Sequence, residues 1–146
     1  DNGREKFEHS YDDLAVAALK FMSSQVGEQS IKAFAETRAD DIIKKASATM
    51  AKRSHKSEAL ATFLSEQGYA ASVAVKSHGE EICQHHCPIA HVAAEFPQLC
   101  EAETRAFSEL LGTHVQRLAT IAHGDGVCTT FIPKSARSST TKKGRS

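Results

Sequence analysis

Residues 83–133 read CQHHCPIAHVAAEFPQLCEAETRAFSELLGTHVQRLATIAHGDGVCTTFIP, and this stretch decides the fold. Two prolines divide its first half, and proline is favoured at the first position of a helix. The sequence therefore predicts a short helix that Cys87-Pro88 opens and that runs to residue 94. It also predicts a second helix over residues 97–111, which Gly112 ends.

The second half of the stretch predicts a β-hairpin. Residues 113–122 and 127–132 are strand-like runs. The sequence His-Gly-Asp-Gly at 123–126 joins them, and its Asp-Gly pair favours the positive φ of a tight turn. We therefore expect two neighbouring antiparallel strands here.

A first hairpin is predicted upstream of this stretch. Residues 69–75 alternate between apolar and smaller or polar side chains, which is the period of a half-buried strand. His78-Gly79 offers a turn before a second strand at residues 81–85.

The first 68 residues predict helices. Ser10 and Asp13 resemble a capping box, and apolar residues then recur at helical spacing up to Gly27. A long amphipathic helix follows to Met50, and residues 57–67 form a third helix. The predicted class is α+β: N-terminal helices followed by a small antiparallel sheet, with two short helices between its hairpins.

Composition limits the function classes. The chain has 146 residues, 40% of them apolar and 25% charged, which fits one globular domain. Since no apolar run approaches the ~20 residues of a membrane span, we expect no membrane partner. No secretory signal is recognisable, so we expect a cytoplasmic protein.

The charges are unevenly distributed. Five of the 18 basic residues lie in residues 134–146 and none of the 18 acidic ones does, so residues 1–133 are mildly acidic. This body lacks the basic face that binding to phosphates requires. We expect a disordered basic tail over residues 134–146, and DNA contact, if there is any, through another part of the protein.

All four cysteines, Cys83, Cys87, Cys100 and Cys128, lie in the second half of the chain. Disulfides are disfavoured because nothing indicates secretion. A zinc site and an iron-sulfur cluster remain. The spacing does not decide between them, because paired Cys-x-x-Cys units of zinc sites and the ferredoxin pattern are both missing.

Three cysteines are predicted to converge. Cys87 is expected at the N-cap of the first short helix, and Cys100 in the first turn of the second. Helix N-termini lower the pKa of a thiol. Cys128 follows the turn of the second hairpin, which could hold it over the two helix starts. The fourth ligand is predicted to be Cys83, with His114 as the alternative.

An enzyme is the third reading. Cys87 and His114 could form a nucleophile and a base, with Asp125 orienting the base. This reading leaves the other three cysteines unexplained, and no nucleophile-elbow or phosphate-loop motif is present. We therefore expect that the chain is not an enzyme.

The stretch 83–133 resembles the signature of SufR-type winged-helix repressors. The similarity includes the Cys-x12-Cys-x27-Cys frame, the following Glu-x-Glu, the Leu-Gly-x-His step and the Gly-Asp-Gly-x-Cys-Thr-Thr ending. The segment HSYDDLA at 9–15 resembles the start of the sensor half of that family. Residues 1–8 then resemble the end of an upstream winged-helix domain, and residues 9–133 the sensor and dimerisation domain.

The resemblance implies a homodimeric repressor of iron-sulfur cluster assembly genes. Its cluster, most simply [4Fe-4S], controls whether the full-length protein binds operator DNA through the upstream domain. The ligands of the family correspond to Cys87, Cys100 and Cys128. Cys83 stands outside that three-cysteine frame.

Overall fold

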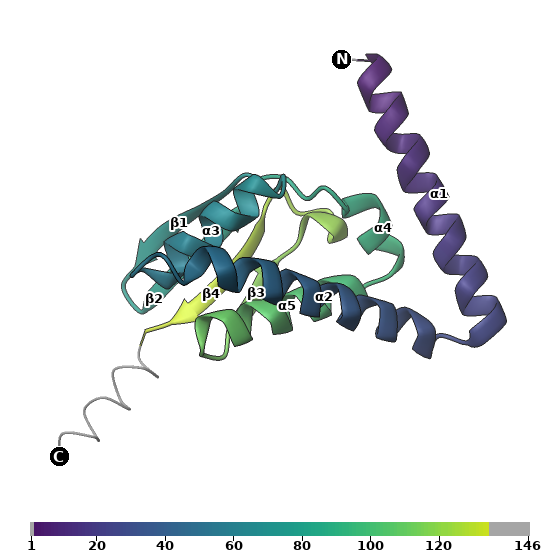
Figure 1. The fold of residues 1–146 in the computed structure, drawn as a ribbon. Coiled ribbons are helices and arrows are strands. Elements are labelled where there is room, and N and C mark those ends of the chain that lie inside the picture. Colours follow the sequence, from purple (N-terminus) through teal and green to yellow (C-terminus); the bar gives the residue numbers. More distant parts are fainter. Residues whose placement is uncertain (1, 135–146) are drawn as a thin grey trace.

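The computed structural model describes residues 2–134. Their elements, in chain order, are α1 (Asn2–Val26), α2 (Gln29–Met50), α3 (Lys56–Glu66), β1 (Ala71–Lys76), β2 (Gly79–Gln84), α4 (Ala90–Glu95), α5 (Gln98–Leu111), β3 (Gln116–Ala119), the 3-10 turn η1 (Ile121–His123) and β4 (Cys128–Pro133). Figure 1 shows helices packed against one small sheet, with α1 extending away from them. The predicted α+β class is confirmed, and α4 and α5 lie between the two hairpins as expected.

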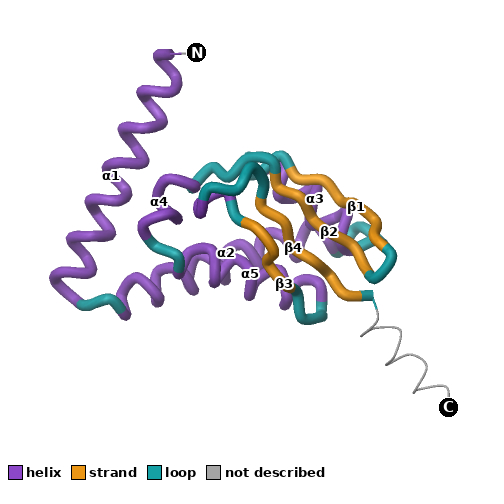
Figure 2. Tube along the Cα trace, turned by 180° about the vertical axis from the view of Figure 1, so that it is seen from behind, coloured by secondary structure: helices purple, strands orange, loops and turns teal. Residues whose placement is uncertain are grey.

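The sheet has four antiparallel strands in the order β1-β2-β4-β3. The two predicted hairpins, β1-β2 and β3-β4, join through β2 and β4 at the centre, with Gln84 opposite Cys128 and Ile82 opposite Thr130. Figure 2, seen from behind, shows the strands in front of the helices. Among the described elements, helices cover one face of the sheet and leave the other uncovered (Figure 2).

The N-terminal helix is longer than the sequence predicts. Ser10 lies inside α1, so the capping box expected there is wrong. The residues before it include Arg4, Glu5 and Lys6, which have high helix propensity and continue the helix upstream. α1 passes residues 8 and 9, the expected domain boundary, without a break. The basic tail at 135–146 lies outside the described residues.

The first strand of the second hairpin is shorter than predicted. β3 covers only Gln116–Ala119, and its register with β4 shifts between Arg117 and Ala119, as in a β-bulge. The chain then leaves the sheet because Thr120 and Asp125 bond to each other. The Thr120 N–H donates to the Asp125 carboxylate at 2.9 Å, and the Asp125 N–H donates to the Thr120 carbonyl at 3.0 Å.

The core has two parts that meet near the cysteines. One part lies between the sheet and helices α2, α3 and α5, and contains Phe107, Ile82 and Cys87. The other lies between α1, α2, α4 and α5, and Cys100 packs at its edge. Burial of these apolar side chains is the main favourable contribution to folding.

Within residues 2–134, every helix is too short or too polar to cross a bilayer.

Candidate thiol site

Three of the four cysteines come from separate parts of the chain and lie near one another. Cys87 lies in the segment between β2 and α4, Cys100 in the first turn of α5, and Cys128 at the first position of β4. Cys87 and Cys128 are buried, and Cys100 is half-buried. The three thiols are close enough to affect one another electrostatically. The convergence of these three residues was predicted from the sequence, although their individual settings differ from the prediction.

Cys87 is not an N-cap residue. α4 begins at Ala90 with Ile89 as its N-cap, so Cys87 lies one turn earlier. The Ile89 N–H nevertheless donates to the Cys87 thiol. Cys128 has a comparable partner, because the Ile121 N–H donates to its Sγ at 3.1 Å. Two thiols therefore receive a backbone hydrogen bond, which stabilises a thiolate.

The expected lowering of the thiol pKa values is wrong for the metal-free chain. Burial raises the pKa of Cys87 to about 12, and the bond from Ile89 only partly offsets this. Burial and then the Glu103 carboxylate also raise the pKa of Cys100, against a smaller opposite effect of Arg117. Desolvation of the charged form outweighs the helix dipole here. The thiols of Cys87 and Cys100 are protonated unless a bound cation compensates their charge.

Cys83 lies on the other face of the sheet. It pairs with Ser72 and Thr129, whereas its neighbour Gln84 pairs with Cys128. Residues directly opposite each other share a face, and consecutive residues alternate between faces. Cys83 and Cys128 therefore point to opposite sides of β2 and β4. This geometry does not support Cys83 as the fourth ligand.

His114 is remote from the three thiols as well. It is exposed and follows Gly112, which ends α5. Cys100 is at the other end of that helix, and the eleven residues from there to Leu111 span about 16 Å at 1.5 Å per residue. The geometry supports neither the alternative fourth ligand nor a pair of Cys87 and His114. Asp125, the third residue of the enzyme reading, closes the loop before β4 instead.

Unpaired polar atoms surround Cys128, and the sequence analysis did not anticipate them. Among the described residues, five buried side-chain nitrogen or oxygen atoms have no hydrogen-bond partner, and four of them belong to Gln84, Arg117 and Thr130. Gln84 is opposite Cys128, Thr130 is two residues along β4, and Arg117 is opposite Thr130. All three share the helix-covered face with Cys128. We call Gln84, Arg117 and Thr130 the unpaired patch.

The fifth unpaired atom, Gln98 Oε1, belongs to the first turn of α5, two residues before Cys100. A buried polar atom without a partner costs about 1–3 kcal/mol, so native proteins rarely tolerate several together. A sequence signal for one of them does exist. Gln84 lies two residues after buried Ile82 in β2, so both side chains are on the same face of the strand. A polar residue is unusual on the face that is otherwise apolar and buried.

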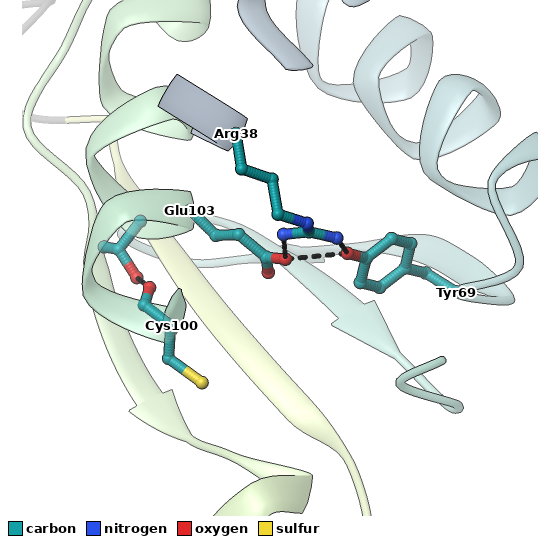
Figure 3. A network of polar contacts seen from close by, with 5 residues as sticks. Arg38, Tyr69, Cys100 and Glu103 are labelled. Carbon is teal, nitrogen blue, oxygen red and sulfur yellow. Dashed lines mark hydrogen bonds and ion pairs between the residues drawn. The ribbon is translucent and has the colours of Figure 1, made fainter. Parts of the chain in front are cut away.

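The polar atoms of a second buried cluster are paired with one another. Arg38 Nη1 and the Tyr69 hydroxyl each donate to Glu103 Oε2 at 2.7 Å, and Arg38 Nη2 donates to the Tyr69 oxygen at 3.3 Å. Figure 3 shows these three side chains meeting, with Cys100 one turn along the same helix as Glu103. We call Arg38, Tyr69 and Glu103 the paired triad.

The site offers three thiols and unused hydrogen-bond donors, and the chemistry of this set suits an anionic, sulfur-liganded group. Among residues 2–134, no three His, Cys, Asp or Glu side chains are gathered closely enough to hold one metal ion. Tetrahedral zinc would require thiolate sulfurs about 3.8 Å apart, given a Zn–S distance of about 2.3 Å. Arg117 and Thr130, on the same face of the sheet as Cys128, offer unused donors.

Comparison of the chain with protein-family models, with curated proteins and with solved structures gives no match.

Proposed function

We propose that this chain binds an iron-sulfur cluster through Cys87, Cys100 and Cys128. The observation that carries the proposal is the position of the unpaired patch next to these thiols. The unpaired atoms include donors on Arg117 and Thr130, which an anionic group would satisfy, and one acceptor oxygen on Gln84, which would require a donor. Thiolate ligands and sulfide would provide the anionic group, and hydrogen bonds to their sulfur atoms would satisfy the donors.

A zinc-binding structural module is the alternative. An iron-sulfur cluster places its own iron and sulfide atoms between the cysteine sulfurs, so its ligands stand farther apart than those of a single ion. The resemblance of residues 83–133 to SufR-type repressors favours the larger core. The three-cysteine set leaves one iron of a [4Fe-4S] cluster without a cysteine ligand from this frame, which would make the cluster labile and suit a sensor.

The regulatory part of the proposal follows from the resemblance to SufR-type repressors. In the full-length protein, occupancy of the cluster would control operator binding by an upstream winged-helix domain and thereby repress cluster assembly genes. The mildly acidic composition of residues 1–133 is consistent with DNA contact through another domain. Assembly as a cytoplasmic homodimer belongs to the same proposal.

The homodimer has structural support on α1. Leu14 and Phe21 are 65% and 66% exposed, and Ala18 between them is exposed too. Their spacing of four and three residues forms a stripe along one side of the helix, whereas Val16 and Leu19 are buried on another side. An uncharged stripe is compatible with a symmetric contact, because identical residues meet without like-charge repulsion. We propose that two copies pack through this stripe.

The cluster is tested by anaerobic reconstitution with iron and sulfide, followed by metal and acid-labile sulfide analysis. We expect a brown protein that holds stoichiometric sulfide. Cys100→Ser should lose the colour while its circular dichroism is unchanged. Cys83→Ser is the matched control and should retain the cluster, because Cys83 lies on the far face of the sheet.

Two results would contradict the proposal. A colourless wild-type protein that binds zinc stoichiometrically would favour the zinc module. Full retention of the cluster in Cys100→Ser would refute the ligand set.

The dimer is tested separately by sedimentation equilibrium. Leu14→Glu combined with Phe21→Glu should convert a dimer to a monomer and leave cluster binding intact. Lys32→Glu, an exposed change on α2, is the control and should remain dimeric. A wild-type monomer, or a dimer that survives both changes on α1, would exclude this interface.

A further inference from the structure

The unpaired patch contains a cation. Arg117 lies on β3 opposite Thr130, so its side chain is directed toward the helix-covered face of the sheet. Its Nε and Nη2 atoms are buried and have no hydrogen-bond partner. Arginine is almost never buried with unused donors, because desolvating the charge without compensation is costly.

The position of Arg117 is fixed by contacts that do not use these donors. Its guanidinium carbon lies 5.6 Å from the centre of the Phe107 ring, which is fully buried in α5. This is a cation–π arrangement, and it stabilises the charge without accepting a hydrogen bond. The register of β3 shifts directly after Arg117, and a β-bulge of this kind changes the direction of neighbouring side chains. The donors are therefore oriented before any ligand arrives.

The buried carboxylate of α5 does not neutralise Arg117. Glu103 already accepts hydrogen bonds from Arg38 and Tyr69 within the paired triad. Arg117 lies on the same face of the sheet as Cys128 and is close enough to Cys100 to lower the pKa of that thiol. Its unused donors therefore lie near these cysteines and remain available for an anion.

We propose that Arg117 is a positioning residue of the cluster site, whose Nε and Nη2 groups donate to the sulfur atoms of the cluster and its thiolates. The inference rests on the proposed function. A cluster held by three thiolates carries net negative charge, which the buried guanidinium would offset. Hydrogen bonds to cluster sulfurs and nearby charge also determine the reduction potential and the retention of such groups.

The test compares Arg117→Met with the wild type and with Arg105→Met. Methionine keeps the apolar stem of the arginine and removes the charge and the donors. Arg105 is the control, because it is an arginine on α5 whose guanidinium is partly exposed and already paired with Asp40 and Glu109. The first measurement is the half-life of the reconstituted cluster against an iron chelator under anaerobic conditions. We expect Arg117→Met to shorten it roughly 10- to 100-fold, the usual effect of losing an outer-shell partner.

Two further measurements separate this role from a merely structural one. The melting temperature of the metal-free Arg117→Met protein should equal or exceed that of the wild type, because an uncompensated buried charge has been removed. The midpoint potential of the loaded variant should become more negative, since loss of a positive charge disfavours the added electron. The cluster half-life of Arg117→Lys should lie between those of the wild type and Arg117→Met, because lysine keeps the charge without the planar donors.

An unchanged half-life together with a lower melting temperature of the metal-free variant would overturn the inference and leave Arg117 a packing residue. A wild-type protein that holds no sulfide after reconstitution would refute the proposed function itself. The sulfide content of the wild-type protein is measured before any variant is compared, so a failure of the proposed function is distinguishable from a failure of this inference.

Discussion

The paired triad and the unpaired patch both place an arginine inside the protein, but only the paired triad provides hydrogen-bond partners for it. Arg38 reaches a carboxylate and a phenol in the paired triad, where the polar atoms converge on Glu103 Oε2. Arg117 in the unpaired patch contacts an aromatic ring and leaves two buried nitrogens without partners. The first arrangement connects α2, α5 and the start of the β1 hairpin. The second lies on the sheet face of Cys128 and leaves donors of Arg117 unused in the metal-free fold.

This difference separates a structural cluster from a binding one. A buried ionic group that is fully paired is costly to break, because the remaining partner is left charged in a low-dielectric interior. A buried polar group that is already unpaired costs little to remove. Substitutions in the two clusters should therefore change the stability of the metal-free protein in opposite directions.

The largest effect is expected for Glu103→Ala in the paired triad. Glu103 is 3% exposed, and its loss leaves Arg38 without a carboxylate. We expect the free energy of unfolding of the metal-free protein to fall by about 3–5 kcal/mol, measured by urea denaturation. Glu103→Gln keeps an acceptor, so its free energy of unfolding should fall by less. A loss below about 1 kcal/mol for Glu103→Ala would mean that the triad contributes no more than a surface ion pair.

A smaller loss is expected for Tyr69→Phe, which removes the donor to Glu103 and the longer bond, at 3.3 Å, that the Tyr69 oxygen accepts from Arg38. Hydrogen bonds to charged groups contribute about 1.5–3 kcal/mol, so we expect a decrease in that range at neutral pH. Thermal and urea denaturation would both report it.

The same variant has a signature in alkaline solution. Burial and the Glu103 carboxylate raise the pKa of Tyr69 above its usual value of 10.0. The folded protein thus holds this proton more tightly than the unfolded chain, so stability is retained below pH 10 and lost as pH rises above it. Tyr69→Phe should lose less stability than the wild type between pH 10 and 11. Parallel pH profiles would show that Tyr69 ionises equally in both states.

The smallest effect, with the opposite sign, is expected for Thr130→Val in the unpaired patch. Valine keeps the shape and removes a buried hydroxyl that has no partner. We expect the metal-free protein to be unchanged or stabilised by up to about 1 kcal/mol. Ser57→Ala is the matched control, because Ser57 is also buried but donates to Glu80 at 2.6 Å, and it should be destabilised. Equal losses in the two variants would remove the distinction between the clusters.

Local signals in the sequence predicted most of the fold. Pro97 and Gly112 mark the two ends of α5, and Gly68 follows α3. Proline restricts φ to values that suit the start of a helix, whereas glycine allows the positive φ that often ends one. Helical and alternating periodicity located the remaining helices and both hairpins. The start of α1 was missed, because Ser10 can cap a helix but also tolerates a helical interior when the residues before it favour the helix.

The candidate site was predicted only in part. The frame of Cys87, Cys100 and Cys128 is visible in the sequence, and the structure brings these three to one region. Cys83 was included because it is near Cys87 along the chain. The pairing of β2 with β4 places it on the other face of the sheet, and that pairing joins residues more than forty positions apart.

By itself, the sequence determined the α+β class, the order of helices and hairpins, and the three cysteines that can meet, since these depend on residue periodicity, on proline and glycine, and on spacing. Only the tertiary structure decided the faces of Cys83 and Cys128 and the unequal surroundings of Arg38 and Arg117. Strand register and hydrogen-bond partners depend on which distant segments pack together. A one-residue change in register reverses the direction of every side chain in a strand, and no local pattern records that choice.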